Sequence, residues 1–384
     1  MIVGEEGKTV PQVTVNNLEV RRANRNRIYQ YISRKEQVSK QEIAHALHMS
    51  LPTVTQNLKD LMEQELVEEA GMLESTGGRK AAAYSCRFRA RAAIGVDLTK
   101  NHISAVVVDL KGTVLSHKRI RCAFSKTEAY FHRLGQLVEQ VIGCAGVSSS
   151  QILGVGIAVP AIVSQDHQTM SYSPALGETS CRLSDFEQAL PYPCFLYNDA
   201  NAAGFAETWN HSQIGNVAYL SLNFTVGGAI LIDGKVYGGD DRRSAEFGHM
   251  TIVPEGELCY CGQRGCADAY LSAQRLAECA DGSVALFFDK LKAGDEHCRE
   301  VWDQYVKALV LTVNNLRMIF DCSVILGGYV GSYAEDFLAE VVEAAAQKNT
   351  FERDGGYLRA CSYRLEATAV GAGLQFVERF IKQI

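Results

Sequence analysis

The sequence of 384 residues has no uncharged apolar run of the roughly 18 residues that a membrane-spanning helix requires. The longest apolar stretch, residues 152–163, is interrupted by two glycines and a proline. The first residues, MIVGEEGK, are acidic and contain no signal-peptide core. We therefore expect a cytoplasmic protein that has no membrane partner.

A strong net charge is also absent, because 38 Lys and Arg residues stand against 44 Asp and Glu residues, a balance of −6. With an apolar fraction of 47%, this small charge excludes disorder for most of the chain, and the length indicates more than one domain. The sequence has 12 cysteines, and thiols stay reduced in the cytoplasm. These cysteines need an explanation other than a disulfide framework.

The charge is unevenly distributed along the chain. Up to Arg91 there are 14 Lys and Arg against 11 Asp and Glu, a balance of +3, whereas the remainder has 24 against 33, a balance of −9. One short segment holds five arginines: Arg21, Arg22, Arg25, Arg27 and Arg34. A basic front on an acidic body indicates that only the front meets a polyanion, although a solvated basic helix face would have the same composition.

The front of the chain has the pattern of three helices. Apolar residues with helical spacing predict a helix over residues 21–34, with Tyr31 beside its apolar side. Ser39 and Glu42 have the spacing of a capping box, which begins a second helix. Ser50 can cap a third helix, and one apolar stripe follows it: Val54, Leu58, Leu61 and Met62. This layout is typical of a helix-turn-helix.

The other side of the third helix carries side chains suited to base edges and phosphates in a major groove: Ser50, Thr53, Thr55, Gln56 and Lys59. Residues 66–70 and 82–84 can pair as a hairpin around a glycine-rich tip, residues 75–80. Arg79 on this tip can enter a minor groove. A three-helix scaffold that binds protein is the alternative, but the combined features favour operator DNA as the partner.

We therefore divide the chain into a disordered arm over residues 1–17, a winged helix-turn-helix domain over residues 18–90 and a body over residues 91–384. The body contains two similar strand units, followed by helical patterns; the predicted strands are residues 94–96, 104–108, 217–222 and 229–232. Two such halves indicate an α/β body of two lobes with a cleft between them. A duplicated unit of this kind is the layout of the actin-like, ribonuclease H-like sugar kinases, an analogy that by itself assigns no function.

Residues 249–266 have the composition of a metal site. Three thiolates and one imidazole satisfy a tetrahedral Zn²⁺ ion: His249, Cys259, Cys261 and Cys266. Because protein fills all four positions, no site remains for a water molecule, and the predicted role is structural. Free or redox-active thiols are the weaker alternative. The other nine cysteines are interpreted as small buried hydrophobic residues.

Four motifs resemble the ROK family (repressor, ORF, kinase), whose members are sugar kinases and sugar-responsive repressors. Residues 248–272, which contain CYCGQRGC, resemble the family signature. Three further stretches of this sequence resemble other motifs of the family: NDANAAGFAE at residues 198–207, ILGVGIAVPAIV at 152–163 and VILGGYVG at 324–331. The resemblance covers essentially all of the chain after residue 91. It also implies the zinc site, and the front is similar to the winged helix of the repressor branch.

The resemblance implies a sugar site. Kinases of the family bind sugar through an Asn-Asp pair, a Glu-x-Gly-His segment and an acidic residue after the last zinc cysteine. The matching positions here are Asn198, Asp199, Glu246, His249 and Asp268. Carboxylates and amides are the acceptors that sugar hydroxyls need, and Asp199 could take the proton from a hydroxyl that attacks ATP. His249 would bind sugar through one ring nitrogen and zinc through the other.

Both phosphate-binding loops of the kinases are altered in this chain. The first loop resembles Asp-x-Gly-Gly-Thr in those enzymes, but residues 97–101 read DLTKN. The second resembles Gly-Thr-Gly-x-Gly-Gly-Gly, but residues 223–229 read NFTVGGA. Because side chains obstruct phosphate binding at both loops, we expect no ATP and no catalytic residue, which leaves Asp199 as a sugar ligand and a vestigial base. Ala161 stands where the family often has glycine, which changes the shape of the sugar pocket.

The leading hypothesis is a repressor of carbohydrate-metabolism genes that acts as a homodimer or a dimer of dimers. A sugar or sugar phosphate inducer would favour the arrangement of two winged helices that does not bind the operator. An ATP-dependent, glucokinase-like sugar kinase with a DNA-binding extension is the alternative, kept open by Asp97 and Asp199. A body that senses a protein partner is a third interpretation.

Overall fold

The computed structural model describes residues 17–73, 81–171, 173, 175–177, 180–209, 215–364 and 366–384. The predicted arm, apart from residue 17, and the predicted wing tip with Arg79 lie outside the described residues. Two compact units divide the chain: residues up to Ala90 together with Arg379–Ile384, and Arg91–Glu378. No helix within the described ranges is long and apolar enough to cross a membrane.

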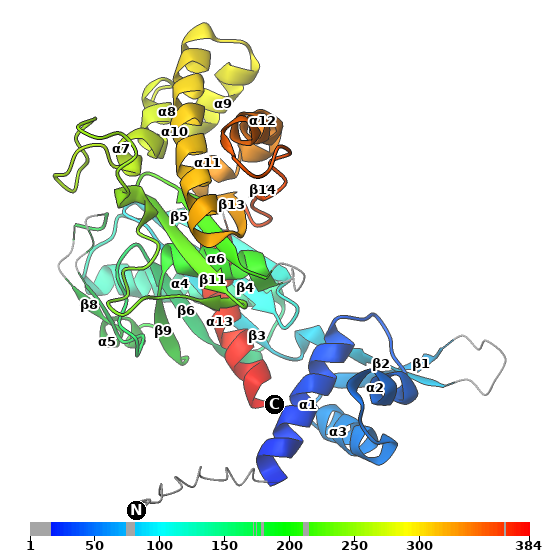
Figure 1. The fold of residues 1–384 in the computed structure, drawn as a ribbon. Helices are drawn as coiled ribbons and strands as arrows, with labels where there is room; N and C mark the ends of the chain where they lie inside the picture. The colour runs from blue at the N-terminus through cyan, green and yellow to red at the C-terminus, as the bar shows by residue number, and fades with distance from the viewer. Residues whose placement is uncertain are drawn as a thin grey trace, which may run out of the picture. The chain divides into compact units, whose positions relative to one another are not determined.

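The N-terminal unit is a helix-turn-helix followed by a two-stranded antiparallel wing (Figure 1). Its elements are α1 (Asn17–Ser33), α2 (Lys40–Leu47), α3 (Leu51–Glu63), β1 (Val67–Met72) and β2 (Ala82–Cys86). Both predicted caps are present, since Ser39 Oγ accepts a hydrogen bond from Glu42 N at 3.1 Å and Ser50 Oγ accepts one from Thr53 N at 3.3 Å. These short side-chain bonds satisfy helix-end N–H groups that would otherwise lack a partner.

Tyr29 is the buried tyrosine of α1, and the hydroxyl of the partly buried Tyr31 donates to Glu42 Oε1 at 3.2 Å. One boundary of this unit differs from the sequence prediction. The last six residues belong to this unit and not to the body, because Asn26 Nδ2 donates to the Ile381 carbonyl. Helix α13 (Ala367–Gln383) therefore contributes residues to both units.

The larger unit contains a five-stranded sheet in the order β5-β4-β3-β6-β9. Its strands are β3 (Ala92–Leu98), β4 (His102–Asp109), β5 (Val114–Arg121), β6 (Ile152–Val159) and β9 (Cys194–Asn198). The first three strands pair antiparallel, whereas β6 and β9 continue the sheet in parallel. The amphipathic helix α4 (Glu128–Ala145) covers one face with six buried side chains: Tyr130, Leu134, Leu137, Val138, Val141 and Ile142.

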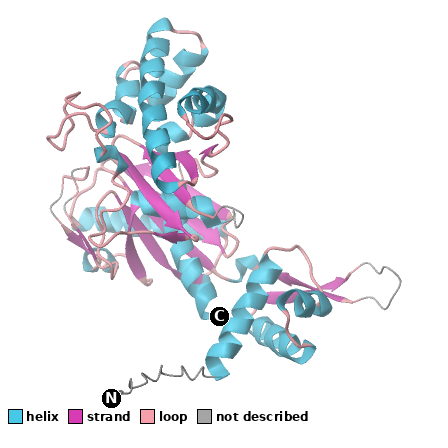
Figure 2. Ribbon diagram, viewed as in Figure 1, coloured by secondary structure: helices cyan, strands magenta, loops and turns pink. Residues whose placement is uncertain are grey.

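A second five-stranded sheet repeats this topology in the order β12-β11-β10-β13-β14. Its strands are β10 (Val217–Leu222), β11 (Val226–Ile232), β12 (Lys235–Val236), β13 (Ser323–Gly327) and β14 (Leu358–Ala360). Again three strands pair antiparallel and two more follow in parallel. The duplicated α/β body predicted from the two strand units is confirmed, and Figure 2 shows both sheets flanked by helices.

Most of the remaining helices lie before or between the strands of the second sheet in the chain. They are α6 (Asp199–Trp209), α7 (Ala267–Leu271), α8 (Ala273–Glu278), α9 (Val284–Lys292), α10 (Glu296–Phe320), α11 (Gly328–Gly331) and α12 (Leu338–Lys348). Two short strands and a short helix complete the larger unit: β7 (Thr169–Met170), β8 (Cys181–Arg182) and α5 (Ser184–Glu187). The long α10 begins at the cap Asp295, whose side chain accepts from Cys298 N at 2.9 Å. Trp302 of α10 is fully buried beside Phe288 and Phe337 and anchors the helices to one core.

Two glycines allow helix α13 to lie close against the first sheet. A Cβ at Gly95 of β3 would collide with the Ala369 carbonyl, and one at Gly156 of β6 would collide with the Ala372 carbonyl. Backbone therefore packs on backbone here, which no larger residue permits.

The nine cysteines outside the predicted metal site are free thiols and are mostly shielded from solvent. Four are buried, namely Cys181, Cys194, Cys298 and Cys322, and four are partly buried, namely Cys86, Cys122, Cys279 and Cys361. Cys144 is exposed, so the interpretation of all nine as buried packing residues is wrong at that position.

Candidate functional site

Helix α3 has an apolar side in the core and a polar side in solvent. Val54 and Leu58 are fully buried, whereas Thr55, Gln56 and Lys59 are exposed. The other two predicted contact residues have a local role as well, since Ser50 Oγ lies 2.8 Å from Thr53 Oγ1 and both begin the helix. The structure thus presents the predicted hydrogen-bonding surface, with Arg79 outside the described residues.

Asp60 on the same helix neutralises part of the basic segment. Its Oδ2 lies 3.4 Å from an Arg21 guanidinium nitrogen and 3.5 Å from one of Arg25, and its Oδ1 accepts from Gln56 Nε2 at 2.9 Å. Sequence reasoning treated these arginines as free positive charge. Within the described residues, Arg22 and Arg34 are exposed without an ion pair, so the accessible basic surface is smaller than the composition indicated.

The larger unit contains a cavity of about 520 Å³, a volume within the range of about 300–1,000 Å³ that is usual for small-molecule sites. Four of the five predicted sugar ligands line it: Asn198, Asp199, Glu246 and His249. Asp268 does not. Its Oδ1 accepts a hydrogen bond from Val226 N at 2.5 Å, so this buried carboxylate supports the start of β11 instead.

The Asn-Asp pair lies where β9 ends and α6 begins. The Asn198 amide is engaged on both sides, because its Nδ2 donates to the Ala161 carbonyl at 3.1 Å and its Oδ1 accepts from Asn201 N at 2.9 Å. Asp199 Oδ1 accepts from Ala200 N at 2.8 Å. Both side chains are therefore fixed in direction before any ligand arrives.

The cavity carboxylates share an unfavourable electrostatic environment. Burial, together with the neighbouring charge of Asp97, raises the pKa of Asp199 to about 7. Burial raises the pKa of Asp97 to about 6, although Arg119 opposes the shift. Burial also raises the pKa of Glu246, and His249 opposes it. Near neutral pH, Asp199 can therefore donate or accept a hydrogen bond to a ligand hydroxyl.

Sequence reasoning missed several residues of the cavity. Arg242, Arg243 and Ser244 line it from the loop after β12, and Tyr260 lines it from the cysteine-rich loop. The charged run DDRR, which ends three residues before Glu246, was a signal that could have indicated the two arginines. No sequence pattern distinguished Tyr260 from its neighbours.

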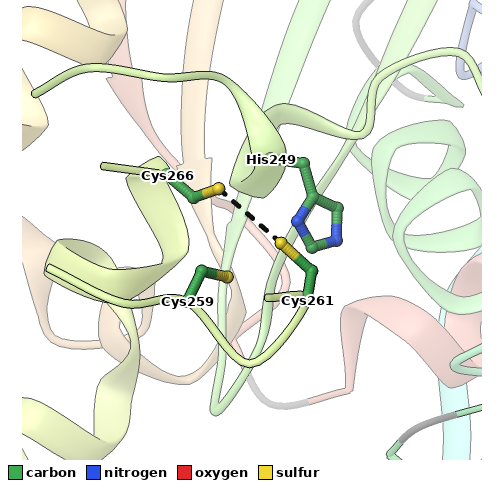
Figure 3. A group of neighbouring side chains, drawn as sticks. All are labelled: His249, Cys259, Cys261 and Cys266. Carbon is green, nitrogen blue, oxygen red and sulfur yellow. Dashed lines mark hydrogen bonds between the residues drawn. The ribbon is translucent and has the colours of Figure 1, made fainter. Parts of the chain in front are cut away.

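The four predicted metal ligands converge (Figure 3). One donor atom from each of His249, Cys259, Cys261 and Cys266 lies within 4.8 Å of the others. Nδ1 of His249 is buried and has no hydrogen-bond partner, and burial raises the pKa of the Cys259 thiol to about 12. A bound dication would give the His249 nitrogen a partner and would favour the deprotonated, thiolate form of the cysteines. Three sulfurs with one nitrogen are a ligand set that Zn²⁺ prefers.

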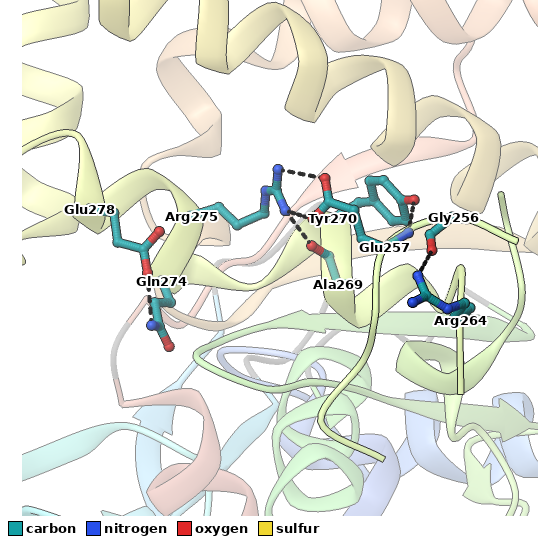
Figure 4. Close-up of polar contacts among 8 residues, drawn as sticks. All are labelled: Gly256, Glu257, Arg264, Ala269, Tyr270, Gln274, Arg275 and Glu278. Atoms are coloured by element: carbon teal, nitrogen blue, oxygen red, sulfur yellow. Dashed lines mark hydrogen bonds and ion pairs between the residues drawn. The ribbon is translucent and has the colours of Figure 1, made fainter. Parts of the chain in front are cut away.

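The segment that leads into this loop is fixed to α7 and α8 (Figure 4). Glu257 N donates to the Tyr270 hydroxyl at 2.8 Å, and the Arg275 guanidinium pairs with the Glu257 carboxylate while donating to the Ala269 carbonyl at 2.8 Å. Arg264 donates to the Gly256 carbonyl at 3.1 Å. These contacts hold the loop from outside the ligand set.

The first altered loop is a tight turn between β3 and β4. Thr99 closes it, because Thr99 Oγ1 accepts from His102 N at 3.1 Å and Thr99 N donates to the His102 carbonyl at 3.0 Å. None of residues 97–101 has a positive φ, so the turn does not form the anion-binding concavity of successive N–H groups.

The second altered loop, between β10 and β11, is bonded to its neighbours. The Asn223 side chain accepts from Tyr329 N at 2.7 Å, and the Phe224 carbonyl accepts from Ser272 Oγ at 2.7 Å. The Phe224 ring is exposed and stacks on Tyr329 at 6.3 Å between centroids. A phosphate would bind backbone N–H groups of this loop, and the N–H of Val226 is already used because it donates to Asp268 Oδ1. The loop is therefore held in place by side chains of the chain itself.

Comparison with known proteins agrees with both units. A sequence model described as ROK family matches residues 93–377, and one described as winged helix-turn-helix DNA-binding matches residues 21–68. The chain is 27% identical over 263 residues to the xylose repressor of Bacillus spizizenii, covering 67% of each protein. It is 24% identical over 361 residues to the xylose repressor of Caldicellulosiruptor bescii, covering 87% of this chain and 90% of that protein.

Solved structures resemble the fold over most of the chain. A ROK family transcriptional regulator, a homolog of the E. coli MLC protein, matches with a TM-score of 0.75 at 18% identity and covers 95% of this chain and 97% of its own. A ROK family glucokinase from Streptomyces griseus, in complex with glucose and AMPPNP, matches with a TM-score of 0.63 at 25% identity. It covers 74% of this chain and 98% of its own.

Proposed function

Because the chain belongs to the ROK family, we propose that it is a sugar-responsive transcriptional repressor of carbohydrate-metabolism genes. The proposal rests on one observation: a helix-turn-helix of the DNA-binding type and a cavity in a sugar-kinase-like fold occur in the same chain. In that chain both altered loops, the β3–β4 and β10–β11 turns, are closed by bonds from the chain's own side chains. The xylose repressors that it resembles are named for such a role. On this proposal the cavity is a sensor and not an active site.

The winged helix-turn-helix binds operator DNA. Thr55, Gln56 and Lys59 are exposed on α3 and would contact bases and phosphates, with Ser50 and Thr53 at the start of the helix. Arg79 of the wing would contact the minor groove. Since one recognition helix reads few bases, the protein acts as a homodimer or a dimer of dimers on a two-fold symmetric site.

The cavity binds the inducer, a sugar or sugar phosphate. Asp199, Glu246 and His249 offer polar groups to its hydroxyls, and Asn198 positions the start of α6 beside them. The two winged helices of the dimer can adopt one arrangement that binds DNA and one that does not. The inducer relieves repression only if it binds more tightly to the arrangement that does not bind DNA. Binding to both arrangements equally would leave repression unchanged.

The cysteine-rich loop holds a structural Zn²⁺ ion. His249 Nδ1 and the thiolates of Cys259, Cys261 and Cys266 are the ligands. The ion fixes one edge of the cavity, because His249 and Cys261 also line it. It takes no chemical part in sensing.

The test uses the full-length protein and begins with selection of an operator from a random duplex library. Anisotropy titrations with the selected duplex then follow the effect of xylose, N-acetylglucosamine, glucose and their phosphates. We expect at least one compound to weaken operator binding tenfold or more, with Asp199→Ala retaining DNA binding but losing the response. If no duplex is enriched, or no compound changes the affinity, the proposal is wrong.

The ATP-dependent sugar kinase is a second candidate because Asp199 lines the cavity, the charge of Asp97 acts on it, and a ROK glucokinase shares the fold. The kinase hypothesis predicts that the protein forms ADP when sugar is present and that Asp199→Asn abolishes this activity. The closed β3–β4 and β10–β11 turns argue against a kinase. We therefore expect the parent protein to form no more ADP than the Asp199→Asn variant does.

A further inference from the structure

Two adjacent arginines line the cavity from the loop that precedes Glu246. Arg242 is partly buried and Arg243 is exposed, and both contribute to the cavity wall on the same side as Ser244. The body that contains them is acidic, with a balance of −9 after Arg91. Asp240 and Asp241 directly precede the two arginines in the chain, but only the arginines of this run line the cavity.

The backbone of this loop is held in an unusual conformation that fixes the arginines. Arg242 has a φ of 60° and Ala245 one of 65°, in the left-handed region that non-glycine residues rarely adopt. Ser244 N donates to the Gly238 carbonyl at 3.2 Å and closes the loop. The Arg242 guanidinium packs on Gly238, where a Cβ would collide with it. The side chain thus lies in a defined place.

Among the residues that the structure describes, no carboxylate forms an ion pair with either of these arginines. Within the described residues, neither Arg242 nor Arg243 forms an ion pair or a hydrogen bond. The positive charge at the cavity is therefore available to a ligand.

We propose that the inducer is a sugar that carries an anionic group, a phosphate ester or a carboxylate, which Arg242 and Arg243 bind. This inference rests on the proposed sugar-sensing function and specifies its ligand class. Guanidinium groups bind both kinds of anion through paired N–H donors, and two adjacent arginines supply more donors than one such group needs. The hydroxyls of the same ligand then face Asp199, Glu246 and His249 across the cavity.

The test compares matched ligands on the zinc-loaded, full-length protein by isothermal titration. Glucose is compared with glucose 6-phosphate and glucuronate, and N-acetylglucosamine with its 6-phosphate. We expect at least one anionic ligand to bind tenfold or more tightly than its neutral parent and to release the selected operator. Comparing glucose 6-phosphate with glucuronate distinguishes a site for a phosphate ester from a site for a carboxylate. The preference should shrink as salt rises, because part of it is electrostatic.

Three variants separate recognition from folding. Arg242→Gly removes the guanidinium and relieves the left-handed backbone, so it should be at least as stable as the parent protein in thermal unfolding. Arg243→Gln removes the exposed member of the pair. Each should lower the preference for the anionic ligand by tenfold or more and leave the affinity for the neutral parent unchanged. Arg133→Gln, an exposed arginine of α4 that does not line the cavity, should behave as the parent protein.

The outcomes are distinguishable. If a neutral sugar binds and releases DNA while its anionic forms bind no better, this inference is wrong and the sugar-sensing function stands. If the anionic preference survives in both arginine variants, the assignment of Arg242 and Arg243 is wrong. If no ligand binds or releases DNA, the sugar-sensing function itself is overturned and this inference with it.

Discussion

The hydroxyl of Tyr260 lies 3.2 Å from Nε2 of His249, while Nδ1 of the same ring is buried without a partner. One ring nitrogen is thus turned to the cavity side, where Tyr260 also lies, and the other is left for the metal. The imidazole therefore joins the proposed metal site to the cavity wall, and loss of a bound metal ion should alter the cavity in which we propose that the inducer binds.

Loss of the metal should destabilise the larger unit. Cys261→Ser, or treatment with a chelator, should lower the metal content below one ion per chain and lower the Tm by about 2–4 °C for each kcal/mol lost. Cys144→Ser, at an exposed cysteine outside the ligand set, is the matched control and should change neither quantity. Full retention of zinc by Cys261→Ser, measured by elemental analysis, would contradict the assigned ligand set.

The buried carboxylates predict a dependence of stability on pH. The folded chain holds protons on Asp97 and Asp199 up to pH values of about 6 and 7, whereas the ordinary pKa of an aspartate is 3.8. Because the folded state binds more protons than the unfolded state between about pH 4 and 7, their contribution to stability falls as pH rises through that window. Asp199→Asn lacks one of these titrating groups, so the stability of this variant should depend less on pH than that of the parent protein.

Urea unfolding at pH 5 and pH 8 measures this effect. The stability of Asp199→Asn relative to the parent should rise by on the order of 2 kcal/mol between the two values, after allowance for the partial exposure of the side chain to cavity water. Asp240→Asn, at an exposed position of the same unit, should show no such rise. An equal pH profile for Asp199→Asn and the parent would show that Asp199 is ionised throughout.

The recognition helix predicts two kinds of DNA defect. Thr55→Ala should weaken binding to the selected operator by about 1–3 kcal/mol without affecting random duplex, because a base contact carries sequence information. Lys59→Gln should weaken both and lower the salt dependence by about one charge, as expected for a phosphate contact. Thr55 is exposed, and within the described part of the chain Lys59 forms one ion pair, with the exposed Glu63 at 3.8 Å. Neither change should therefore reduce the Tm. Equal losses on operator and random DNA for Thr55→Ala would refute base contact.

Two glycine substitutions should have opposite effects on stability. Gly95→Ala places a Cβ against the Ala369 carbonyl and should destabilise the larger unit by about 3 kcal/mol or more. Gly143→Ala, inside helix α4 with open space around it, should stabilise by about 0.5–1 kcal/mol. Denaturant unfolding of both variants checks the packing of α13 on β3, and a stable Gly95→Ala protein would contradict it.

The parts of the fold that the sequence predicted well depend on local signals. Ser39 and Ser50 begin their helices as expected because an N-cap acts within three residues of itself. The strand units repeat, so each supported the interpretation of the other. The four predicted metal ligands, which the structure brings close together, all fall within residues 249–266.

The parts that it missed depend on distant partners. Asp60 neutralises Arg21 from 39 residues away, and Asp268 bonds Val226 N from 42 residues away. No pattern of residue spacing in the sequence predicts either contact. The loop that carries Arg242 and Arg243 to the cavity contains two non-glycine residues in the left-handed region, Arg242 and Ala245, and their residue types do not predict that conformation.

The β10–β11 turn also constrains how this protein can change. Replacing Phe224 with glycine would open space, but the Phe224 carbonyl would still accept from Ser272 and Asn223 would still hold Tyr329. The β3–β4 turn would remain closed by Thr99 in any case. Nucleotide binding would therefore require coordinated substitutions at two separate turns, and no single substitution opens both of them.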